Sequence, residues 1–158
     1  MGKYFQEKSK FYYNNYVNKK LTQKVSAIIR NGNKFLMLVN KQGRAYDVGG
    51  SVEPGEKARQ AILREIKEET GGEVAKIKYF TKIYYQVEWE YNGIIFPNKR
   101  VEYIYVAELK DNNIHIKGLE EEFTNADSLG WFTLKELKDL KQSERSMDLF
   151  RRSKEVKL

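Results

Sequence analysis

The chain has 158 residues, of which 41% are hydrophobic and 13% aromatic, and it carries a net charge of +7. This composition excludes a disordered chain, and the absence of cysteine excludes disulfides, thiol catalysis and thiolate metal sites. No apolar run approaches the length of a membrane span. We therefore expect a cytoplasmic protein with one domain, as a monomer or a homodimer, without a membrane partner.

The N-terminal segment, residues 1–23, is rich in aromatic residues, which show no clear helical or strand periodicity. We expect this segment to form a short irregular or helical arm that packs on a single domain formed by residues 24–158. Two apolar stretches follow, 24–30 and 34–39, and the Asn-Gly-Asn sequence between them supplies the positive φ angles that a tight turn needs. These stretches are predicted to pair as a β-hairpin.

The best-marked element is a helix from about Lys57 to Thr70, which follows a short strand over residues 45–48 and a glycine-containing loop. Its residues are mostly good helix formers, and Gly71-Gly72 provides a stop that tolerates left-handed backbone. Residues on one side of this helix are expected to form an apolar arc that consists of Ile62, Leu63 and Ile66. The arc beside it carries three carboxylates, Glu65, Glu68 and Glu69.

This carboxylate cluster indicates a metal site. Glu65 and Glu69 are four residues apart, and like charges at that spacing destabilise a helix, more so beside its buried edge. A divalent cation is the simplest compensation. Because the candidate ligands are oxygens in a chain with no cysteine and a single histidine, Mg²⁺ is the expected ion, with Mn²⁺ able to substitute.

Residues around the cluster are expected to support it. Gly49 and Gly50 lack a Cβ and would let backbone come close to an ion or a phosphate. Arg64 can brace a ligating carboxylate through a bidentate contact, and Glu56 can balance the arginine.

The second half of the chain is predicted to complete a sheet and to add two helices. Residues 75–91 alternate between apolar and polar over their second half, and residues 100–109 are the expected partner strand. Thr133 is the expected N-cap of a helix that runs to about Leu140, with Glu136 at the capping-box position. The remaining expected elements are a short strand at 114–117, a strand that ends at 131–132 and a final helix over 144–151. This order predicts an α/β fold, an α/β/α sandwich with a mixed β-sheet between helices.

One motif in this chain resembles the Nudix box, the sequence signature of the Nudix hydrolase family. Its matching positions are Gly50, Glu56, Arg64, Glu65, Ile66, Glu68, Glu69 and Gly71. The family usually ends the box with an aliphatic residue, where this chain has Gly72, and often has proline where this chain has Val48. The resemblance implies the Nudix fold over about residues 24–141.

The resemblance also implies a reaction, the hydrolysis of a nucleoside diphosphate linked to another group X, with a nucleoside triphosphate as the default substrate. In that reaction Glu65, Glu68 and Glu69 would hold the metal, and a backbone carbonyl of Gly49 or Gly50 would add a ligand. The residues expected to carry catalysis are Glu69, Glu65, Arg64 and Glu56.

Other candidate residues lie outside the box. The general base, or an extra metal ligand, is sought in a loop that contains Glu120, Glu121 and Glu122, and otherwise in Glu102 on a strand. A solvated loop and an ion pair of Glu102 with Lys or Arg are the structural alternatives. Candidate nucleotide contacts are Trp89, Tyr85 and Asn125, although the aromatic residues could instead line the core or a dimer interface.

The positive net charge leaves two interpretations open. Scattered lysines can simply solubilise the surface, or part of the excess can steer nucleotide or RNA phosphates to the site. Nucleic acid is a possible partner, but no nucleic-acid-binding motif favours it. The alternatives to a nucleotide pyrophosphohydrolase are therefore an RNA 5′-end pyrophosphohydrolase and a catalytically silent nucleotide-sensing module, and the intact acids count against the last.

Overall fold

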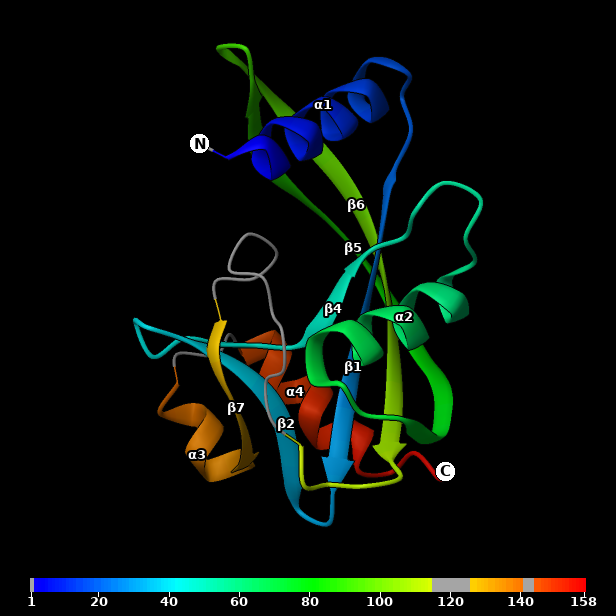
Figure 1. Ribbon diagram of the computed structural model, residues 1–158, viewed down its shortest axis with the longest axis vertical. Coiled ribbons are helices and arrows are strands. Elements are labelled where there is room, and N and C mark those ends of the chain that lie inside the picture. The colour runs from blue at the N-terminus through cyan, green and yellow to red at the C-terminus, as the bar shows by residue number, and fades with distance from the viewer. Residues whose placement is uncertain (1, 115–125, 141–143) are drawn as a thin grey trace.

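The computed structural model describes residues 2–114, 126–140 and 144–158 (Figure 1). The helices are α1 (Lys3–Val17), α2 (Ala58–Thr70), α3 (Leu134–Lys138) and α4 (Glu144–Ser153). The strands are β1 (Thr22–Asn31), β2 (Lys34–Asn40), β3 (Ala45–Tyr46), β4 (Val48–Ser51), β5 (Val74–Tyr91), β6 (Ile94–Leu109) and β7 (Ala126–Thr133).

The strands form one mixed sheet in the order β3-β2-β1-β6-β5, with β4 paired to β1 and β7 paired to β2. Strand β1 is central because it has three partners. Residues 22–29 pair with β6 in parallel, residues 24–27 pair with β4, and the end of β1 forms the predicted hairpin with β2. The glycines at the start of the Nudix-like motif therefore lie on β4, directly against the middle of β1.

Strand β6 is longer than the sequence indicates, since it begins at Ile94 and not at Arg100. A two-residue turn connects it to β5, and Asn92 and Gly93 there adopt positive φ angles of 49° and 79°. Pro97 is tolerated because β1 pairs with β6 only from Arg100 onward, so that Pro97 lies where β6 has no second neighbour to which it would donate.

The predicted strand over residues 45–48 is two short strands. Ala45–Tyr46 pairs with β2, whereas Val48–Ser51 pairs with β1, so the chain changes partner at Asp47. The predicted cap of α3 is confirmed: the Thr133 hydroxyl accepts from the Glu136 N–H at 3.2 Å, and the Glu136 carboxylate accepts from the Thr133 N–H at 3.1 Å. Residues 115–117 of another predicted strand lie outside the described residues.

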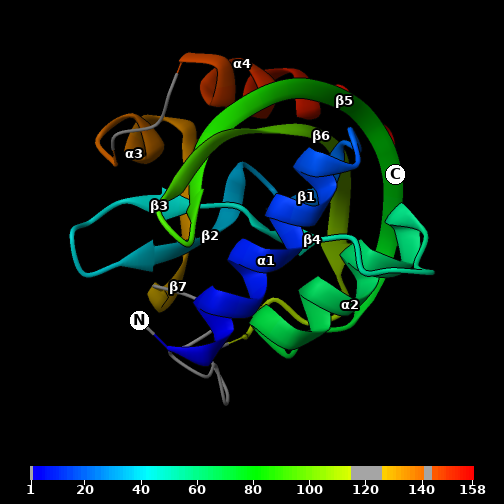
Figure 2. The same ribbon diagram turned by 90° about the horizontal axis from the view of Figure 1, so that it is seen from above.

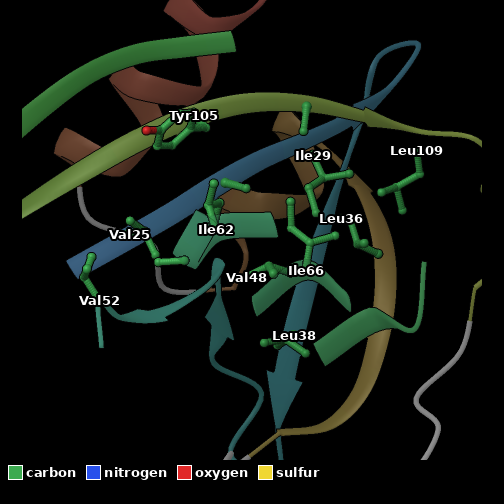
Figure 3. Packing of buried hydrophobic residues seen from close by; sticks show 13 residues of the cluster. Val25, Ile29, Leu36, Leu38, Val48, Val52, Ile62, Ile66, Tyr105 and Leu109 are labelled. Atoms are coloured by element: carbon green, nitrogen blue, oxygen red, sulfur yellow. The ribbon is translucent and has the colours of Figure 1, made fainter. Parts of the chain in front are cut away.

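Helices cover both faces of the sheet, which confirms the predicted sandwich. On one face, α2 buries Ala61, Ile62 and Ile66 against residues of β1, β2, β4 and β6 (Figure 3). On the other face, Leu137 of α3 and Met147 and Phe150 of α4 pack in a second core. The expectation that Leu63 belongs to the apolar arc is wrong: the residue is 37% exposed, because α2 meets the sheet along Ala61, Ile62 and Ile66.

The N-terminal segment forms a regular helix, so the helical form of the predicted arm is the one observed. Helix α1 lies across the β5–β6 hairpin (Figures 1 and 2), where the Tyr13 ring lies 5.0 Å from that of Tyr91 and 5.6 Å from that of Phe96. Within the described residues, no helix is long and apolar enough to cross a membrane.

Candidate active site

Two glycines of β4 bring helix α2 into contact with the sheet backbone. At Gly50, a Cβ would occupy the position of the Glu65 carboxylate. At Gly49, a Cβ would collide with the backbone carbonyl of Val25 and lie 2.9 Å from the Cα of Ser26. Gly49 is therefore required for the packing of β4 on β1, and Gly50 leaves the position that the Glu65 carboxylate occupies.

Glu69 is buried at the same place. Only 7% of the residue is exposed, and its Oε1 accepts a hydrogen bond of 2.8 Å from the N–H of Gly49. Burial, together with the charge of Glu65, raises the pKa of Glu69 to about 8. Burial also raises the pKa of Glu65, although Arg64 opposes that effect. Glu69 is thus costly to ionise unless a cation lies beside it, whereas Glu65 has Arg64 as a cationic partner.

Arg64 organises these acids, but with a different partner from the one expected. Its bidentate contact is to Glu56, through Nε at 2.9 Å and Nη2 at 3.0 Å. Glu65 and Glu68 each accept from Nη1, at 2.9 and 3.2 Å, and the carbonyl of Ser51 accepts from Nη2 at 3.1 Å. Glu56 therefore fixes the guanidinium, which in turn orients Glu65.

The donor atoms fit a hard divalent cation. Glu65 and Glu69 bring two carboxylates together next to glycine backbone, which matches the one or two carboxylates that Mg²⁺ usually takes. Among the described residues, no three acidic side chains are arranged as a complete metal site, since the Glu68 side chain is 58% exposed and contacts Arg64. The metal-ligand roles of Glu68 and of the Gly49 and Gly50 carbonyls remain predictions.

A second pair of acids consists of Glu102 on β6 and Asp47 between β3 and β4. Glu102 accepts hydrogen bonds from Ser26 Oγ at 3.2 Å and from Tyr85 OH at 3.0 Å, so the partners seen are hydroxyls and not the Lys or Arg of the alternative interpretation. Asp47 Oδ1 is buried without a hydrogen-bond partner in the described part of the chain. Its burial, and secondarily Glu102, raises the pKa of Asp47 to about 7.

Basic side chains gather around Tyr12 of α1, beside the last residue of β4. We call Lys8, Lys24 and Arg100 the cationic cluster. Lys24 Nζ donates to Ser51 Oγ at 3.1 Å and to Tyr12 OH at 3.5 Å. The Arg100 guanidinium carbon lies 4.9 Å, and Lys8 Nζ 6.0 Å, from the centre of the Tyr12 ring.

Sequence reasoning missed the cationic cluster and Asp47. A signal for Lys24 does exist, because Lys24 and Ser26 are polar residues in a strand whose other central residues are buried on both faces. Polar side chains at such positions are usually hydrogen-bonded, so both residues are expected to have a partner. Nothing in the sequence indicates that Tyr12 reaches β4, since 39 residues separate it from Ser51.

Tyr85 and Trp89, two of the predicted nucleotide contacts, have different neighbours in the structure. Tyr85 contacts Glu102, as described above. The Trp89 indole donates to Ser9 Oγ at 3.0 Å and meets the Tyr12 ring edge-on at 4.9 Å, so this side chain contributes to the packing of α1. Their roles in nucleotide binding remain predictions. Asn125 and the candidate bases Glu120, Glu121 and Glu122 lie outside the described residues.

The family model of the NUDIX domain matches residues 20–152 of the chain. A Bacillus subtilis protein named "Putative 8-oxo-dGTP diphosphatase YtkD" is 50% identical over 56 residues, which are 35% of each chain. The NAD-capped RNA hydrolase NudC of Vibrio atlanticus is 42% identical over 55 residues, 33% of this chain and 20% of that protein. The matches thus span about a third or less of the length of these relatives.

Solved structures share the fold. The dihydroneopterin triphosphate pyrophosphohydrolase of E. coli superimposes with a TM-score of 0.62 over 82% of this chain and 92% of that chain, at 19% sequence identity. At that identity the similarity establishes the architecture and not the substrate.

Proposed function

Because the chain belongs to the Nudix hydrolase family, we propose that it is a divalent-metal-dependent pyrophosphohydrolase that cleaves a diphosphate bond of a nucleotide. One observation carries this proposal: the buried carboxylate of Glu69 and the partly buried carboxylate of Glu65 lie together against the backbone of Gly49 and Gly50. A solvated acidic helix would have no reason to bury these groups, because their ionised forms are costly without a cation.

Each residue of the site has a separate proposed role. Glu65 and Glu69 would hold Mg²⁺, and Arg64, fixed by Glu56, would keep Glu65 oriented. When bound, the ion neutralises phosphate oxygens and lowers the pKa of a coordinated water. The glycines of β4 let Glu65 and the backbone of β1 come close to this strand, which holds the carboxylates in place.

The proton of the attacking water needs an acceptor. Glu102 is the candidate that the described structure contains, and its carboxylate, held by two hydroxyl donors, has a fixed position on β6. Glu120, Glu121 and Glu122 are the alternatives.

The experiment is phosphate and pyrophosphate release with Mg²⁺ or Mn²⁺ across a substrate panel. The panel contains nucleoside triphosphates, oxidised dNTPs, ADP-ribose, nucleotide sugars, dinucleoside polyphosphates and 5′-triphosphorylated RNA. We expect turnover that EDTA abolishes. Glu69→Gln should reduce turnover by at least about 100-fold, as does the loss of a group that acts on the reacting atoms. Glu88→Gln, a change to an exposed residue of β5, is the matched control and should keep wild-type turnover.

The outcomes separate the candidate functions. The names of the two curated relatives point to different substrates, a free nucleotide for one and an RNA end for the other. Preferential turnover of triphosphorylated RNA, with an affinity that falls steeply with salt, would favour the RNA 5′-end function. Nucleotide binding without turnover would favour the sensing module, and wild-type turnover by Glu69→Gln would refute the catalytic assignment.

A further inference from the structure

Strand β5 is the last strand of the sheet, and one of its two edges faces no other strand in the described part of the chain. Over its 18 residues β5 pairs with β6, and the strand order ends there. Figure 2 shows β5 as the outermost strand of the curved sheet. No backbone hydrogen bond from another described segment reaches residues 82–91. We call the side of residues 82–90 that points away from β6 the outer edge of β5, and it is open to a further strand.

The turn after β5 decides which backbone groups point to this edge. Tyr91 and Ile94 flank the two-residue turn and face each other, and in such a hairpin the closing pair exchanges both hydrogen bonds. Bonded and non-bonded pairs alternate, so Glu90 and every second residue before it direct N–H and C=O away from β6. Pro97, which has no N–H, faces Glu88 at one of these non-bonded pairs, as the alternation requires. The outward-bonding residues are Lys82, Tyr84, Gln86, Glu88 and Glu90.

The two halves of β5 differ at this edge. Register shifts at 74–76 and 79–81 interrupt the first half, and irregularities of that kind hinder the pairing of a further strand. From residue 82 to residue 91 the register is unbroken, and this stretch contains no proline or glycine. A regular edge of this kind is where another strand can add to a sheet.

The charges on the outward-bonding residues favour a copy of the same strand. All five residues are exposed, with a positive charge at one end on Lys82 and negative charges at the other end on Glu88 and Glu90. Within the described residues, none of these three charges forms an ion pair. An antiparallel copy related by a two-fold axis at Gln86 places Lys82 opposite Glu90 of the partner subunit. Opposite charges in facing positions stabilise a strand pair, whereas a parallel copy in register would oppose like charges.

The same arrangement satisfies the backbone. With the axis at Gln86, each outward-bonding residue faces another outward-bonding residue, so every free N–H and C=O between residues 82 and 90 gains a partner. The ring of Tyr84, which is 61% exposed, then lies opposite Glu88 of the partner subunit. Backbone pairing and charge pattern thus select the same register.

We propose that the outer edge of β5 binds a second copy of this chain, as an antiparallel pair of β5 strands with the two-fold axis at Gln86. The sheets of the two copies form one continuous sheet. Because the carboxylates of the candidate active site lie on α2, each copy keeps its own site, and turnover per chain is the same in both states. The association therefore does not depend on the proposed function, and its test requires no hydrolysis.

Sedimentation velocity of the full-length chain at increasing concentration tests the association. We expect the mass to rise from that of one chain towards that of two. Lys82→Glu should raise the dissociation constant by about tenfold or more, because attraction at both symmetry-related pairs becomes repulsion of similar size. A wild-type chain that stays monomeric at about 1 mM, the weak end of specific association, would refute the proposal.

Charge exchange tests the register. Adding Glu90→Lys to Lys82→Glu recreates facing opposite charges and should bring the dissociation constant back to within about threefold of wild type. Adding Glu88→Lys instead should restore less, because residues 82 and 88 do not face each other about this axis; stronger rescue by Glu88→Lys would refute the register. Lys138→Glu, an equal change in net charge at an exposed residue of α3, should leave the association unchanged, and an equal weakening by this control would refute the charge pairing.

Amide hydrogen exchange identifies the surface that is used. We expect exchange at the amides of Tyr84, Gln86 and Glu88 to slow as the concentration rises, because these groups face solvent in the monomer and bond to the partner in the dimer. The amides of Val87 and Trp89, which point to β6, should be protected at every concentration. A dimer in which the outward amides still exchange as in the monomer would overturn the proposal.

A proline at the centre of the edge separates association from folding. Gln86→Pro removes an outward N–H and no bond to β6, a position where a sheet tolerates proline. We expect it to abolish the association while urea unfolding of the dilute, monomeric protein stays close to that of the wild type. Association that persists in a folded Gln86→Pro variant would show that this edge is not the interface.

Discussion

The carboxylate of Glu65 occupies the position that a side chain on Gly50 would need. A methyl group there would push the carboxylate away, and it can move because it is the end of a flexible side chain. We expect Gly50→Ala to fold with a free energy of unfolding within about 1 kcal/mol of wild type. Its turnover should fall by about 100-fold, since a displacement of about 1 Å at a reacting centre has that effect. Wild-type turnover would contradict the role of Glu65.

Gly49→Ala, in contrast to Gly50→Ala, is expected to lose stability. Its added methyl group would meet the carbonyl of Val25 and the Cα of Ser26, which are backbone atoms of a central strand and cannot move aside. We expect a loss of about 1–3 kcal/mol in the free energy of unfolding, the usual cost of overpacking. Urea unfolding of the two alanine variants measures the contrast, and equal midpoints would show that the β4 backbone adapts.

The metal-free protein should lose stability as the pH rises. The pKa of Glu69 is raised from 4.5 to about 8 in the folded state, so the folded protein holds this proton more tightly than the unfolded chain. The resulting stabilisation is complete below pH 4.5 and is lost as the pH rises through 8. Urea unfolding in EDTA at several pH values should show this decline.

Two changes should remove that pH dependence. Glu69→Gln has no proton to lose, so its stability in EDTA should change less than that of the wild type between pH 4.5 and pH 8. Added Mg²⁺ should restore the wild type at alkaline pH, because an ion that binds only the folded state stabilises it by mass action. A wild-type protein whose stability in EDTA does not vary over this range would disprove the raised pKa.

Arg64→Lys should impair activity although it keeps the charge. A lysine cannot make the two parallel contacts to Glu56 while it also contacts Glu65. We expect the Mg²⁺ concentration that gives half-maximal activity to rise by about 10- to 100-fold, which is about the effect of losing a residue that orients a metal ligand. Titration of activity with Mg²⁺ measures it. The effect on stability should be small, about 1 kcal/mol or less, because the pair is partly exposed.

The central helix and its acids could be predicted from the sequence because their signals are local. Gly71 adopts a φ angle of 69° at the end of α2, as its place in the sequence indicates, and Ile62 and Ile66 are fully buried. The same helical periodicity brings Glu65 and Glu69 together. The turn at Asn92-Gly93 has a local signal too, in its two positive φ angles, but the sequence predicts that the strand after it begins at Arg100, whereas it begins at Ile94.

Contacts between distant segments could not be predicted in this way. Periodicity assigns Leu63 to the apolar arc. The angle at which α2 meets the sheet instead leaves Leu63 37% exposed. Arg64 has several acids within reach, and only the course of the loop before α2 makes Glu56 its bidentate partner. The contact between Tyr12 and Lys24 depends on how α1 packs on the β5–β6 hairpin, which no local pattern determines.

The way helix α1 is attached to the domain affects how this protein can evolve. None of its described side chains belongs to either hydrophobic core, and it is held by aromatic contacts and by hydrogen bonds to Trp89, Thr22 and Ser51. Substitutions at the exposed positions of α1 can therefore change this surface while both hydrophobic cores stay as they are. Selection can act on this helix while the carboxylates of α2 stay as they are.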